Sequence, residues 1–566
     1  MADIKQILQD TFGFSSFRPG QAEVIGFLLD GRSAAAVFPT GSGKSICYQL
    51  PALVLDGVTL VVSPLIALMK DQIDRLQRQG IRAERLDSSQ SASDTASVLR
   101  ALRKGELKML YVAPERFNNE RFRDTIRQIP VALMTVDEAH CISEWGHNFR
   151  PDYLKLAGFG KLCGAKRMLA LTATATPSVL ADICRVMDIS EECAVRTGFY
   201  RPNLTLLTSN VSAHARDALL VERLGRRAPG PAIVYVTLQK TAEEVAARLA
   251  RQGMPARAYH GGMQSEARAE IQNWFQQSDQ AIIVATIAFG MGIDRANIRG
   301  VYHYNLAKSL ENYCQEIGRA GRDGAHATCE MFVCEDDLET LESFARGDTP
   351  TKAALESFVG QIFSLGPDFG VSAYDLSKAH AIRPLVIGTL LTYLELEGFL
   401  EGGTPFYTRY SVRPLLPVEE ILERFTGERR SFLTSILGHA VVGRVWLRLD
   451  LDEIVAEEGV QRDRVVRALG YLADQQLVEL KAEGVRSRYR RLKAPEDPGA
   501  LAASLHARAV HREERELARL AQVVSMASFE GCRSFFLARY FGEERQGQCG
   551  HCTWCLSSLE EPNRKM

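Results

Sequence analysis

The chain has 566 residues, too many for one hydrophobic core, so we expect several domains. Its 68 Lys and Arg residues nearly balance 69 Asp and Glu residues, which excludes a global basic field as the basis of nucleic-acid binding. No apolar run approaches the ~20 residues of a membrane span, and Met1–Gln6 lacks a signal-peptide pattern, so we expect a cytoplasmic protein with no membrane partner.

The first predicted element with a chemical signature is an apolar strand over residues 33–38, followed by a glycine-rich loop and a helix from residue 45. Such a loop lets backbone amides approach phosphates, while Lys44 reaches the β and γ oxygens and the Ser45 hydroxyl ligates Mg²⁺. One position departs from the general pattern, because Phe38 stands where it has glycine. The predicted nucleotide-binding residues of the loop are Thr40, Gly41, Ser42, Gly43, Lys44 and Ser45.

Further short apolar segments at 60–63, 109–113 and 168–171 alternate with helical stretches. This alternation is typical of a mostly parallel sheet covered by helices, and we assign it to a first α/β domain over residues 1–205.

An acidic pair follows the apolar run 131–136, which predicts a buried strand with Asp137 and Glu138 at its carboxyl end. Open α/β sheets place their ligands at this edge. We expect Asp137 to hold Mg²⁺ and Glu138 to polarise the attacking water, both as catalytic residues. The alternative is a solvated pair at a strand end.

A second alternation begins after residue 205 and predicts an α/β domain over residues 206–343. Its apolar segments are 231–236, 257–260, 281–286 and 301–304.

An internal repeat lies beyond this domain, because residues 376–400 align without gaps to residues 454–478 at an offset of 78. Each copy predicts two helices and a hairpin, the pattern of two tandem winged-helix domains. The predicted domains are 344–415 and 416–495, the hairpins 401–410 and 481–490, and the recognition helices 384–396 and 462–473. A protein-binding or purely architectural role for both domains remains open.

The two predicted hairpins carry different candidate DNA contacts. Arg486, Arg488 and Arg490 alternate along the second hairpin and predict a phosphate-contacting face. Phe406 and Tyr407 near the tip of the first hairpin predict an aromatic wedge that unstacks a base pair at a fork.

Four of the twelve cysteines form the pattern C-x16-C-x2-C-x2-C, namely Cys532, Cys549, Cys552 and Cys555. Four thiolates at this spacing suit tetrahedral Zn²⁺, and disulfides are the poorer alternative in a cytosolic protein. His551 lies inside the cluster, but four thiolates already complete the coordination. We expect residues 496–566 to form a helical hairpin with a structural zinc site.

The motifs together resemble the RecQ family of DNA helicases, over about residues 10–340 and 525–556. Phe14 and residues 17–21 resemble its adenine-recognition motif, which implies nucleotide contacts from Phe14, Arg18 and Gln21. Residues 63–72 and 111–116 resemble motifs that track the DNA strand, and residues 171–175 resemble the motif that couples hydrolysis to domain movement.

Residues 139–152 are similar to the family's aromatic-rich loop, which contacts single-stranded DNA beside the ATP site. The resemblance implies base stacking by Trp145 and Phe149 and a phosphate contact from Arg150. The alternative is that Trp145 and Phe149 are core aromatics.

Residues 284–294 and 315–324 resemble the family's fifth and sixth motifs, which adds Gln315, Arg319 and Arg322 to the catalytic candidates. The two arginines are three residues apart, so we expect them to face the cleft together on one helical turn as arginine fingers.

The resemblance implies two tandem RecA-like domains and an ATP- and Mg²⁺-dependent helicase that moves 3′ to 5′ on single-stranded DNA and unwinds duplex or branched DNA in repair or recombination. It implies a nucleoid-associated monomer that meets single-strand-binding protein. An RNA-directed helicase and a non-unwinding annealing or scaffold protein are the alternatives. We expect the order to depart from the family, because the predicted winged helices precede the zinc module, and with eleven residues after Cys555 we expect neither a downstream winged helix nor the accessory helical domain.

Overall fold

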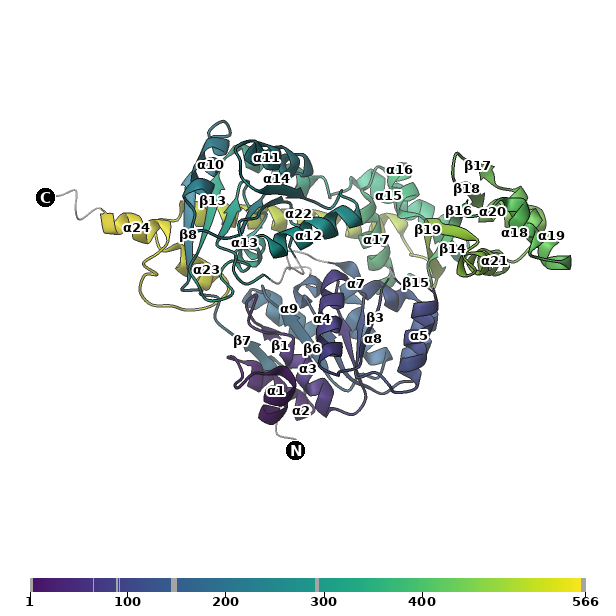
Figure 1. Ribbon diagram of the computed structural model, residues 1–566, viewed down its shortest axis with the longest axis horizontal. Helices are drawn as coiled ribbons and strands as arrows, with labels where there is room; N and C mark the ends of the chain where they lie inside the picture. Colours follow the sequence, from purple (N-terminus) through teal and green to yellow (C-terminus); the bar gives the residue numbers. More distant parts are fainter. Residues whose placement is uncertain are drawn as a thin grey trace. The chain divides into compact units, whose positions relative to one another are not determined.

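The computed structural model describes residues 4–64, 66–87, 90, 92–143, 150–290 and 295–560 (Figure 1). The chain divides into two compact units. The first unit comprises residues 1–117, 121–349 and 507–566, and the second unit comprises residues 118–120 and 350–506.

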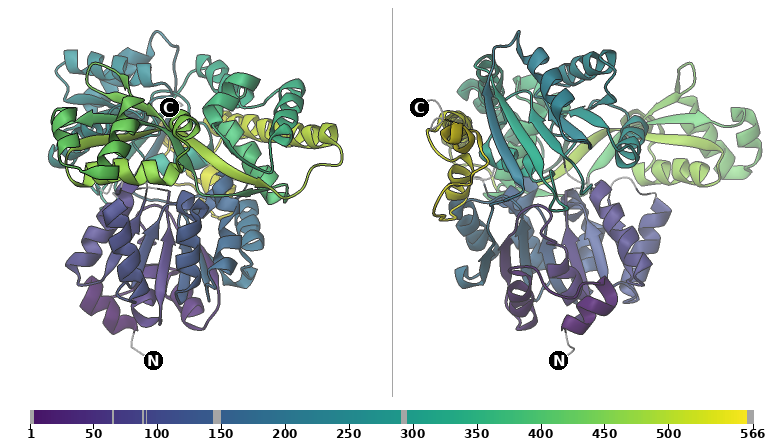
Figure 2. Two further views of the ribbon diagram at one scale, coloured as in Figure 1. Left: turned by 90° about the vertical axis from the view of Figure 1, so that its right-hand side faces the viewer. Right: turned by 60° about the vertical axis from the view of Figure 1, so that its left-hand side comes forward.

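The first unit begins with a seven-stranded parallel sheet in the order β3-β4-β2-β5-β6-β1-β7. Helices cover both faces (Figure 2), and alternate residues of each strand enter different cores, as Val37 and Ala36 do. The strands are β1 (Ala34–Val37), β2 (Val58–Val62), β3 (Ala83–Leu86), β4 (Met109–Val112), β5 (Val131–Val136), β6 (Met168–Thr172) and β7 (Ala194–Arg196). The helices are α1 (Ile4–Phe12), α2 (Gln21–Leu29), α3 (Ile46–Val54), α4 (Ile66–Arg78), α5 (Ala92–Arg103), α6 (Glu120–Arg127), α7 (Pro151–Leu154), α8 (Leu156–Leu162) and α9 (Pro177–Met187).

The five strands predicted for this domain are confirmed as β1, β2, β4, β5 and β6. The sequence did not predict β3 and β7, which form the two edges of the sheet. Edge strands are short and carry polar residues, as Glu84 and Arg85 in β3 do, so their apolar signal is weak.

A second sheet in the same unit has six parallel strands in the order β10-β11-β9-β12-β13-β8. The four predicted strands are confirmed as β9 to β12, whereas β8 and β13 were missed because Thr205, Ser209 and Glu330 interrupt their apolar pattern. The strands are β8 (Leu204–Asn210), β9 (Ala232–Tyr235), β10 (Ala256–Tyr259), β11 (Ile282–Ala285), β12 (Gly300–His303) and β13 (Ala327–Val333). The helices are α10 (Arg216–Arg226), α11 (Gln239–Arg251), α12 (Ser265–Gln277), α13 (Leu310–Ile317) and α14 (Asp336–Arg346).

The C-terminal helices of the first unit pack on this second sheet. α22 (Pro498–Ser528) is followed by α23 (Arg533–Tyr540) and α24 (Thr553–Glu560). Leu537 of α23 and Cys552 share one hydrophobic core with Leu206 of β8. The described helices include none with the length and apolar character that a membrane crossing requires.

The second unit contains one antiparallel sheet in the order β14-β19-β16-β18-β17, with β15 also paired to β19. The predicted recognition helices are confirmed as helices α17 and α21. The helices are α15 (Lys352–Ser364), α16 (Ala373–His380), α17 (Pro384–Leu396), α18 (Val418–Glu423), α19 (Gly427–Gly438), α20 (Leu451–Glu458) and α21 (Arg462–Asp474). The strands are β14 (Asp368–Val371), β15 (Leu400–Gly402), β16 (Phe406–Pro414), β17 (Val441–Val442), β18 (Leu447–Asp450) and β19 (Val478–Arg491).

The prediction of two hairpins is wrong. Residues 478–491 form one 14-residue strand, which pairs in turn with β16 and β15 instead of folding back on itself. Gly484 has a positive φ of 66°, but the Thr408 hydroxyl donates to its carbonyl at 3.0 Å and keeps it between paired residues. Residues 415–477, which include α20 and α21, are therefore inserted between two long paired strands.

Candidate nucleotide site and zinc site

A cavity of about 750 Å³ in the first unit joins the two parallel sheets. It lies at the carboxyl ends of β1 and β5, the edge at which open α/β sheets bind ligands. The predicted residues that line it are Phe14, Arg18, Gln21, Thr40, Gly41, Gly43, Lys44, Ser45, Asp137, Glu138, Gln315, Arg319 and Arg322.

The loop between β1 and α3 adopts the backbone that its glycines allow. Gly41 and Gly43 have φ values of 85° and 78°, a region that side chains disfavour. A Cβ on Gly43 would lie 2.9 Å from Nε2 of Gln21. Lys44 Nζ donates to the Phe38 carbonyl at 3.2 Å, so Phe38 supports the lysine through its backbone.

The residues predicted to recognise the base are hydrogen-bonded to this loop. Gln21 Nε2 donates to the carbonyls of Ser42 at 3.2 Å and Gly43 at 2.9 Å. Gln21 Oε1 accepts from the Arg18 amide at 2.9 Å, and Arg18 Nη1 donates to the Gly41 carbonyl. Phe14 is 49% exposed, so its ring face is open to the cavity. The segment that would select the base therefore also holds the phosphate loop.

The acidic pair directly follows β5, where the Asp137 amide donates to the Val62 carbonyl at 2.9 Å. Glu138 has a left-handed backbone with φ 51° and ψ 44°, which costs energy in a residue with a side chain. Its amide donates to Asp137 Oδ1 at 3.0 Å, and its carbonyl accepts from Cys141 at 2.9 Å. These bonds hold the strained turn that aims both carboxylates at the cavity.

Burial dominates the electrostatics of these groups. It raises the pKa of Asp137 to about 7, with a further increase from the neighbouring Glu138 charge and opposition from Lys44. Burial also raises the pKa of Glu138 and lowers that of Lys44. Two adjacent carboxylates that are costly to ionise, beside a serine hydroxyl, are oxygen donors that suit Mg²⁺.

His140 is a site residue that the sequence did not single out. Its Nδ1 lies 3.3 Å from Glu138 Oε2 and 2.9 Å from the Thr172 hydroxyl at the end of β6. Burial lowers the pKa of His140 to about 3, so the ring is neutral at pH 7. The ring thereby lies between Glu138 and the end of β6.

The second sheet supplies the two arginines, which lie in the turn after α13 and not on a helix as expected. A Cβ on Gly41 would lie 3.5 Å from Cγ of Arg322, whose charge contributes to the lowered pKa of Lys44. Arg319 is 4% exposed, and its positive charge acts on Glu138. Gln315 on α13 is also buried at the cavity.

Two further residues outside the sequence prediction hold this arginine turn. Arg201 Nη2 donates to the carbonyls of Ala320 at 3.2 Å and Gly321 at 2.7 Å. Asn203 Nδ2 donates to Gly321 at 2.8 Å and to Ala325 at 2.8 Å. Both belong to the segment between β7 and β8, and no local pattern marks them because their partners lie more than 100 residues away.

Trp145 and Phe149 of the aromatic-rich segment lie outside the described residues. Arg150 is exposed, and its amide donates to the Cys141 carbonyl at 3.1 Å. Its charge acts on the buried Glu138, so the end of this segment is electrostatically close to the acidic pair.

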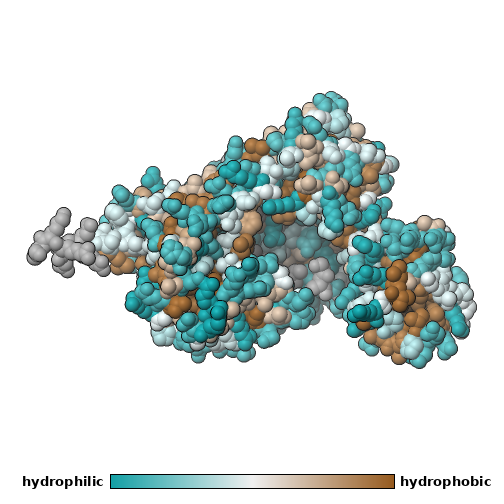
Figure 3. Space-filling view, turned by 90° about the horizontal axis from the view of Figure 1, so that it is seen from above, coloured by the Kyte–Doolittle hydropathy of each residue, from teal (hydrophilic) through white to brown (hydrophobic). Residues whose placement is uncertain are grey.

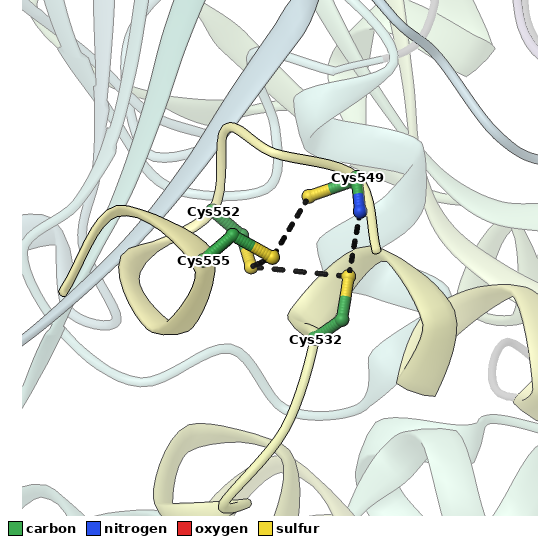
Figure 4. A group of neighbouring side chains, drawn as sticks. All are labelled: Cys532, Cys549, Cys552 and Cys555. Atoms are coloured by element: carbon green, nitrogen blue, oxygen red, sulfur yellow. Dashed lines mark hydrogen bonds between the residues drawn. The ribbon is translucent and has the colours of Figure 1, made fainter. Parts of the chain in front are cut away.

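The four predicted cysteines converge in the C-terminal segment (Figure 4). Their sulfur atoms all lie within 4.8 Å of one another. Burial raises the pKa of Cys532, and it raises the pKa of Cys555 to about 12. Burial also acts to raise the pKa of Cys549, but hydrogen bonds from Ser534 and the His551 amide outweigh it and lower this pKa to about 7. Four convergent sulfurs fit a tetrahedral structural Zn²⁺ site.

His551 does not belong to this sulfur cluster. Its Nε2 lies 3.0 Å from the Tyr200 hydroxyl, so the ring contacts the segment between the two parallel sheets.

The candidate DNA contacts of the second unit differ from the prediction. Phe406 lies within strand β16, which is paired with β19. The Cζ atom of Arg462 lies 4.7 Å from the centre of the Phe406 ring, and the ring fills the space that a Cβ on Gly370 would need. It is a packing residue and not a wedge at a hairpin tip. Tyr407 is 42% exposed. Arg486 and Arg488 lie on β19, and Arg490 there is paired with Asp368 at 3.5 Å and Glu401 at 3.6 Å.

The hairpin that does form in the second unit joins β17 to β18. Val441 pairs with Arg448, and the Gly443 amide donates to the Trp446 carbonyl at 2.9 Å. Val441, Val442 and Val445 are 67%, 77% and 57% exposed. Figure 3 shows apolar side chains on the surface of this unit, at the right of the view.

Three family descriptions match separate parts of the chain. "DEAD/DEAH box helicase" matches residues 18–183, and "Helicase conserved C-terminal domain" matches residues 215–324. "RecQ zinc-binding" matches residues 495–556. The matched ranges contain the phosphate loop, the arginine turn and the four cysteines.

Curated DNA helicases are similar to this chain in sequence. The chain is 43% identical to the ATP-dependent DNA helicase RecQ of Bacillus subtilis over 336 residues, 59% of this chain and 56% of the relative. It is 41% identical to the RecQ of Haemophilus influenzae over 350 residues, 61% of this chain and 56% of the relative. It is 39% identical to the probable ATP-dependent DNA helicase RecS of B. subtilis over 361 residues, 63% of this chain and 72% of the relative. The chain thus spans about half the length of the RecQ relatives.

Solved structures support the fold. The DUF1998 helicase MrfA bound to DNA matches with a TM-score of 0.50 and 19% identity, over 60% of this chain and 52% of that one. Mss116p bound to single-stranded RNA and AMP-PNP matches with a TM-score of 0.50 and 16% identity, over 70% of this chain and 89% of that one. At these identities the likeness concerns the fold alone.

Proposed function

The chain belongs to the RecQ family of DNA helicases, and from this membership we propose that it hydrolyses ATP to move along single-stranded DNA and unwind duplex or branched DNA. The observation that carries the proposal is the cavity in which Lys44, Asp137 and Glu138 of one sheet meet Arg319 and Arg322 of the other. A site divided between two domains works only when they are together, so hydrolysis can drive their relative movement.

Each residue has a distinct task in this proposal. Lys44 would bind the β and γ oxygens, and Ser45 and Asp137 would hold Mg²⁺, which would neutralise phosphate charge. Glu138 orients the attacking water and accepts its proton, while His140 keeps that carboxylate in place. Arg319 and Arg322 stabilise the charge that develops on the γ-phosphoryl oxygens. Gln315 lines the same cavity and would help to position Arg319 and Arg322.

Selection of ATP would come from the residues beside the phosphate loop. Phe14 would stack on the adenine ring, and the amide of Gln21 offers both a donor and an acceptor to its edge. Arg18 and Gln21 already bond to the loop carbonyls, so base binding and phosphate binding would be coupled through them.

The DNA strand would contact the segment that follows the acidic pair, through Trp145, Phe149 and Arg150. We propose 3′ to 5′ movement and a role in repair or recombination by analogy with the family. We further propose that the protein is a monomer, that it is located in the cytoplasm in association with the nucleoid, and that it interacts with single-strand-binding protein.

We propose the domain boundaries 1–205, 206–343, 344–415, 416–495 and 496–566. The segments 344–415 and 416–495 would be winged-helix-like domains that bind duplex DNA through their shared sheet. Arg486 and Arg488 of β19 would contact phosphates, with Arg490 and Tyr407 nearby. Because Phe406 is packed inside the sheet, the exposed valines of the β17–β18 hairpin would replace it as the wedge at a fork.

The test is a comparison of ATP hydrolysis with single-stranded DNA, single-stranded RNA and no nucleic acid, followed by unwinding of 3′-tailed, 5′-tailed and blunt duplexes. We expect stimulation by DNA, unwinding of the 3′-tailed duplex, and loss of both activities in Lys44→Ala. Stronger stimulation by RNA would favour an RNA-directed helicase. DNA annealing without ATP-dependent unwinding would favour a scaffold protein.

A further inference from the structure

The C-terminal zinc module contacts the segment between the two parallel sheets, residues 197–203. This segment connects the end of β7 to the start of β8. Glu543 Oε2 accepts from the backbone amides of Phe199 at 2.6 Å and Tyr200 at 3.3 Å. The Phe541 ring stacks on Phe199, with centroids 4.2 Å apart and an interplanar angle of 9°.

Tyr200 receives two further contacts from the same module. Its hydroxyl lies 3.0 Å from Nε2 of His551, which sits between two of the zinc cysteines in the sequence. Cζ of Arg545 lies 3.7 Å from the centre of the Tyr200 ring, and Arg545 Nη1 lies 3.3 Å from Glu543 Oε1. The zinc module therefore contacts both the backbone and the side chains of Phe199 and Tyr200.

The next residues of the connection hold the arginine turn. Arg201 and Asn203 donate to the carbonyls of Ala320 and Gly321, which lie between Arg319 and Arg322. An unbroken series of hydrogen bonds and peptide units thus runs from Glu543 to the catalytic arginines.

Tight packing surrounds this series. Thr40 of the phosphate loop, Thr174, Tyr200, Gly318 and Leu537 of α23 line one cavity of only about 50 Å³. So little free space remains that a shift of the connecting segment must displace its neighbours.

We propose that Glu543 is a positioning residue for ATP hydrolysis: by holding the amides of Phe199 and Tyr200, it sets the connecting segment that presents Arg319 and Arg322 to the phosphate loop. This inference rests on the proposed ATPase function and assigns the zinc module a part in it. A carboxylate accepting from two amides is a charge-assisted contact, stronger than neutral hydrogen bonds. Small displacements of catalytic groups cost large factors in rate.

The experiment compares full-length Glu543→Ala, Glu543→Gln and Glu544→Ala with the unaltered protein. Glu544 is exposed and adjacent, so its substitution matches the change in charge and side-chain size. Four quantities are measured: kcat and KM for ATP at saturating single-stranded DNA, zinc per chain, and hydrogen exchange of peptides containing Phe199 and Tyr200.

We expect Glu543→Ala to lower kcat at least about tenfold while KM changes less than about threefold, because the arginines act on the transition state. Exchange at residues 199–200 should increase, and zinc content should stay unchanged. Glu543→Gln keeps one acceptor without the charge, so we expect a smaller loss of kcat, about threefold. Glu544→Ala should match the unaltered protein.

An unchanged kcat in Glu543→Ala, with the unaltered protein active, would overturn the inference. If Glu543→Ala loses zinc, Glu543→Gln decides: lowered kcat with zinc retained supports the inference, and unchanged kcat overturns it. Absence of DNA-stimulated hydrolysis in the unaltered protein would instead refute the proposed function. Hydrogen exchange would then still decide whether Glu543 holds the connecting segment.

Discussion

Arg201 Nη2 donates a 2.7 Å hydrogen bond to the carbonyl of Gly321, although the two residues lie 120 positions apart. Gly321 has a positive φ of 53° and stands between the two arginines that face the phosphate loop. A residue of the connecting segment therefore fixes the turn that carries Arg319 and Arg322, the two proposed catalytic arginines.

Replacing Arg201 by alanine should lower DNA-stimulated kcat by about tenfold or more, because the turn carrying Arg319 and Arg322 loses both hydrogen bonds from Nη2. Arg201→Lys should recover little, since one ammonium cannot reproduce the planar fork of donors. The measurement is steady-state ATP hydrolysis. Arg226→Ala, which removes a side chain 75% exposed on α10, is the matched control. Equal kcat in the two alanine variants would contradict the role of Arg201.

Removal of the metal should unfold the C-terminal module. Cys532, Cys552 and Cys555 are buried in the hydrophobic core shared with the second parallel sheet, so Cys552→Ser should lose zinc and lower the unfolding free energy by at least about 3 kcal/mol. Thermal unfolding and zinc content measure the effect. Cys163→Ala removes a buried thiol that takes no part in the sulfur cluster and should keep its zinc. Full zinc content in Cys552→Ser would show that this thiolate is not a required ligand.

Polar substitutions at the β17–β18 hairpin should separate unwinding from hydrolysis. Val442→Ser with Val445→Ser replaces exposed side chains, so stability should change by less than about 0.5 kcal/mol. We expect unwinding of a forked duplex to fall several-fold while single-strand-stimulated hydrolysis stays constant, because only strand separation needs an apolar wedge. Unwinding at the original rate would exclude this hairpin as the wedge.

Phe406→Ala should lower the unfolding free energy of the second unit. The ring fills the space above Gly370 and lies beneath Arg462, but it is only partly buried, so its loss should destabilise the second unit by about 1.5 kcal/mol. Chemical denaturation followed by circular dichroism would measure this. Tyr407→Ala, at the adjacent exposed position, should cost less than about 1 kcal/mol. Equal stability of the two variants would show that Phe406 is not packed in solution.

The sequence alone identified the residues that come together at the proposed nucleotide and zinc sites. Residue type and spacing are enough to identify Lys44 and Ser45, Asp137 and Glu138, and the four cysteines, and each set meets in one place. Their spacing is dictated by local geometry: a loop of amides around a phosphate, carboxylates at a strand end, and paired thiolates around one ion. Strongly apolar central strands such as β5 are predictable for the same reason, because burial on both faces leaves a continuous apolar run.

Only the tertiary structure decided how distant segments support that chemistry. The sequence predicted a hairpin over residues 481–490, but pairing with β16 keeps this segment, Gly484 included, inside β19, and Phe406 packs within β16 as a consequence. The contacts of Glu543 with Phe199 and of Arg201 with Gly321 left no local pattern. Hydrogen bonds between residues more than 100 positions apart depend on where the sheets and the zinc module pack, and no periodicity or spacing along the chain encodes that placement.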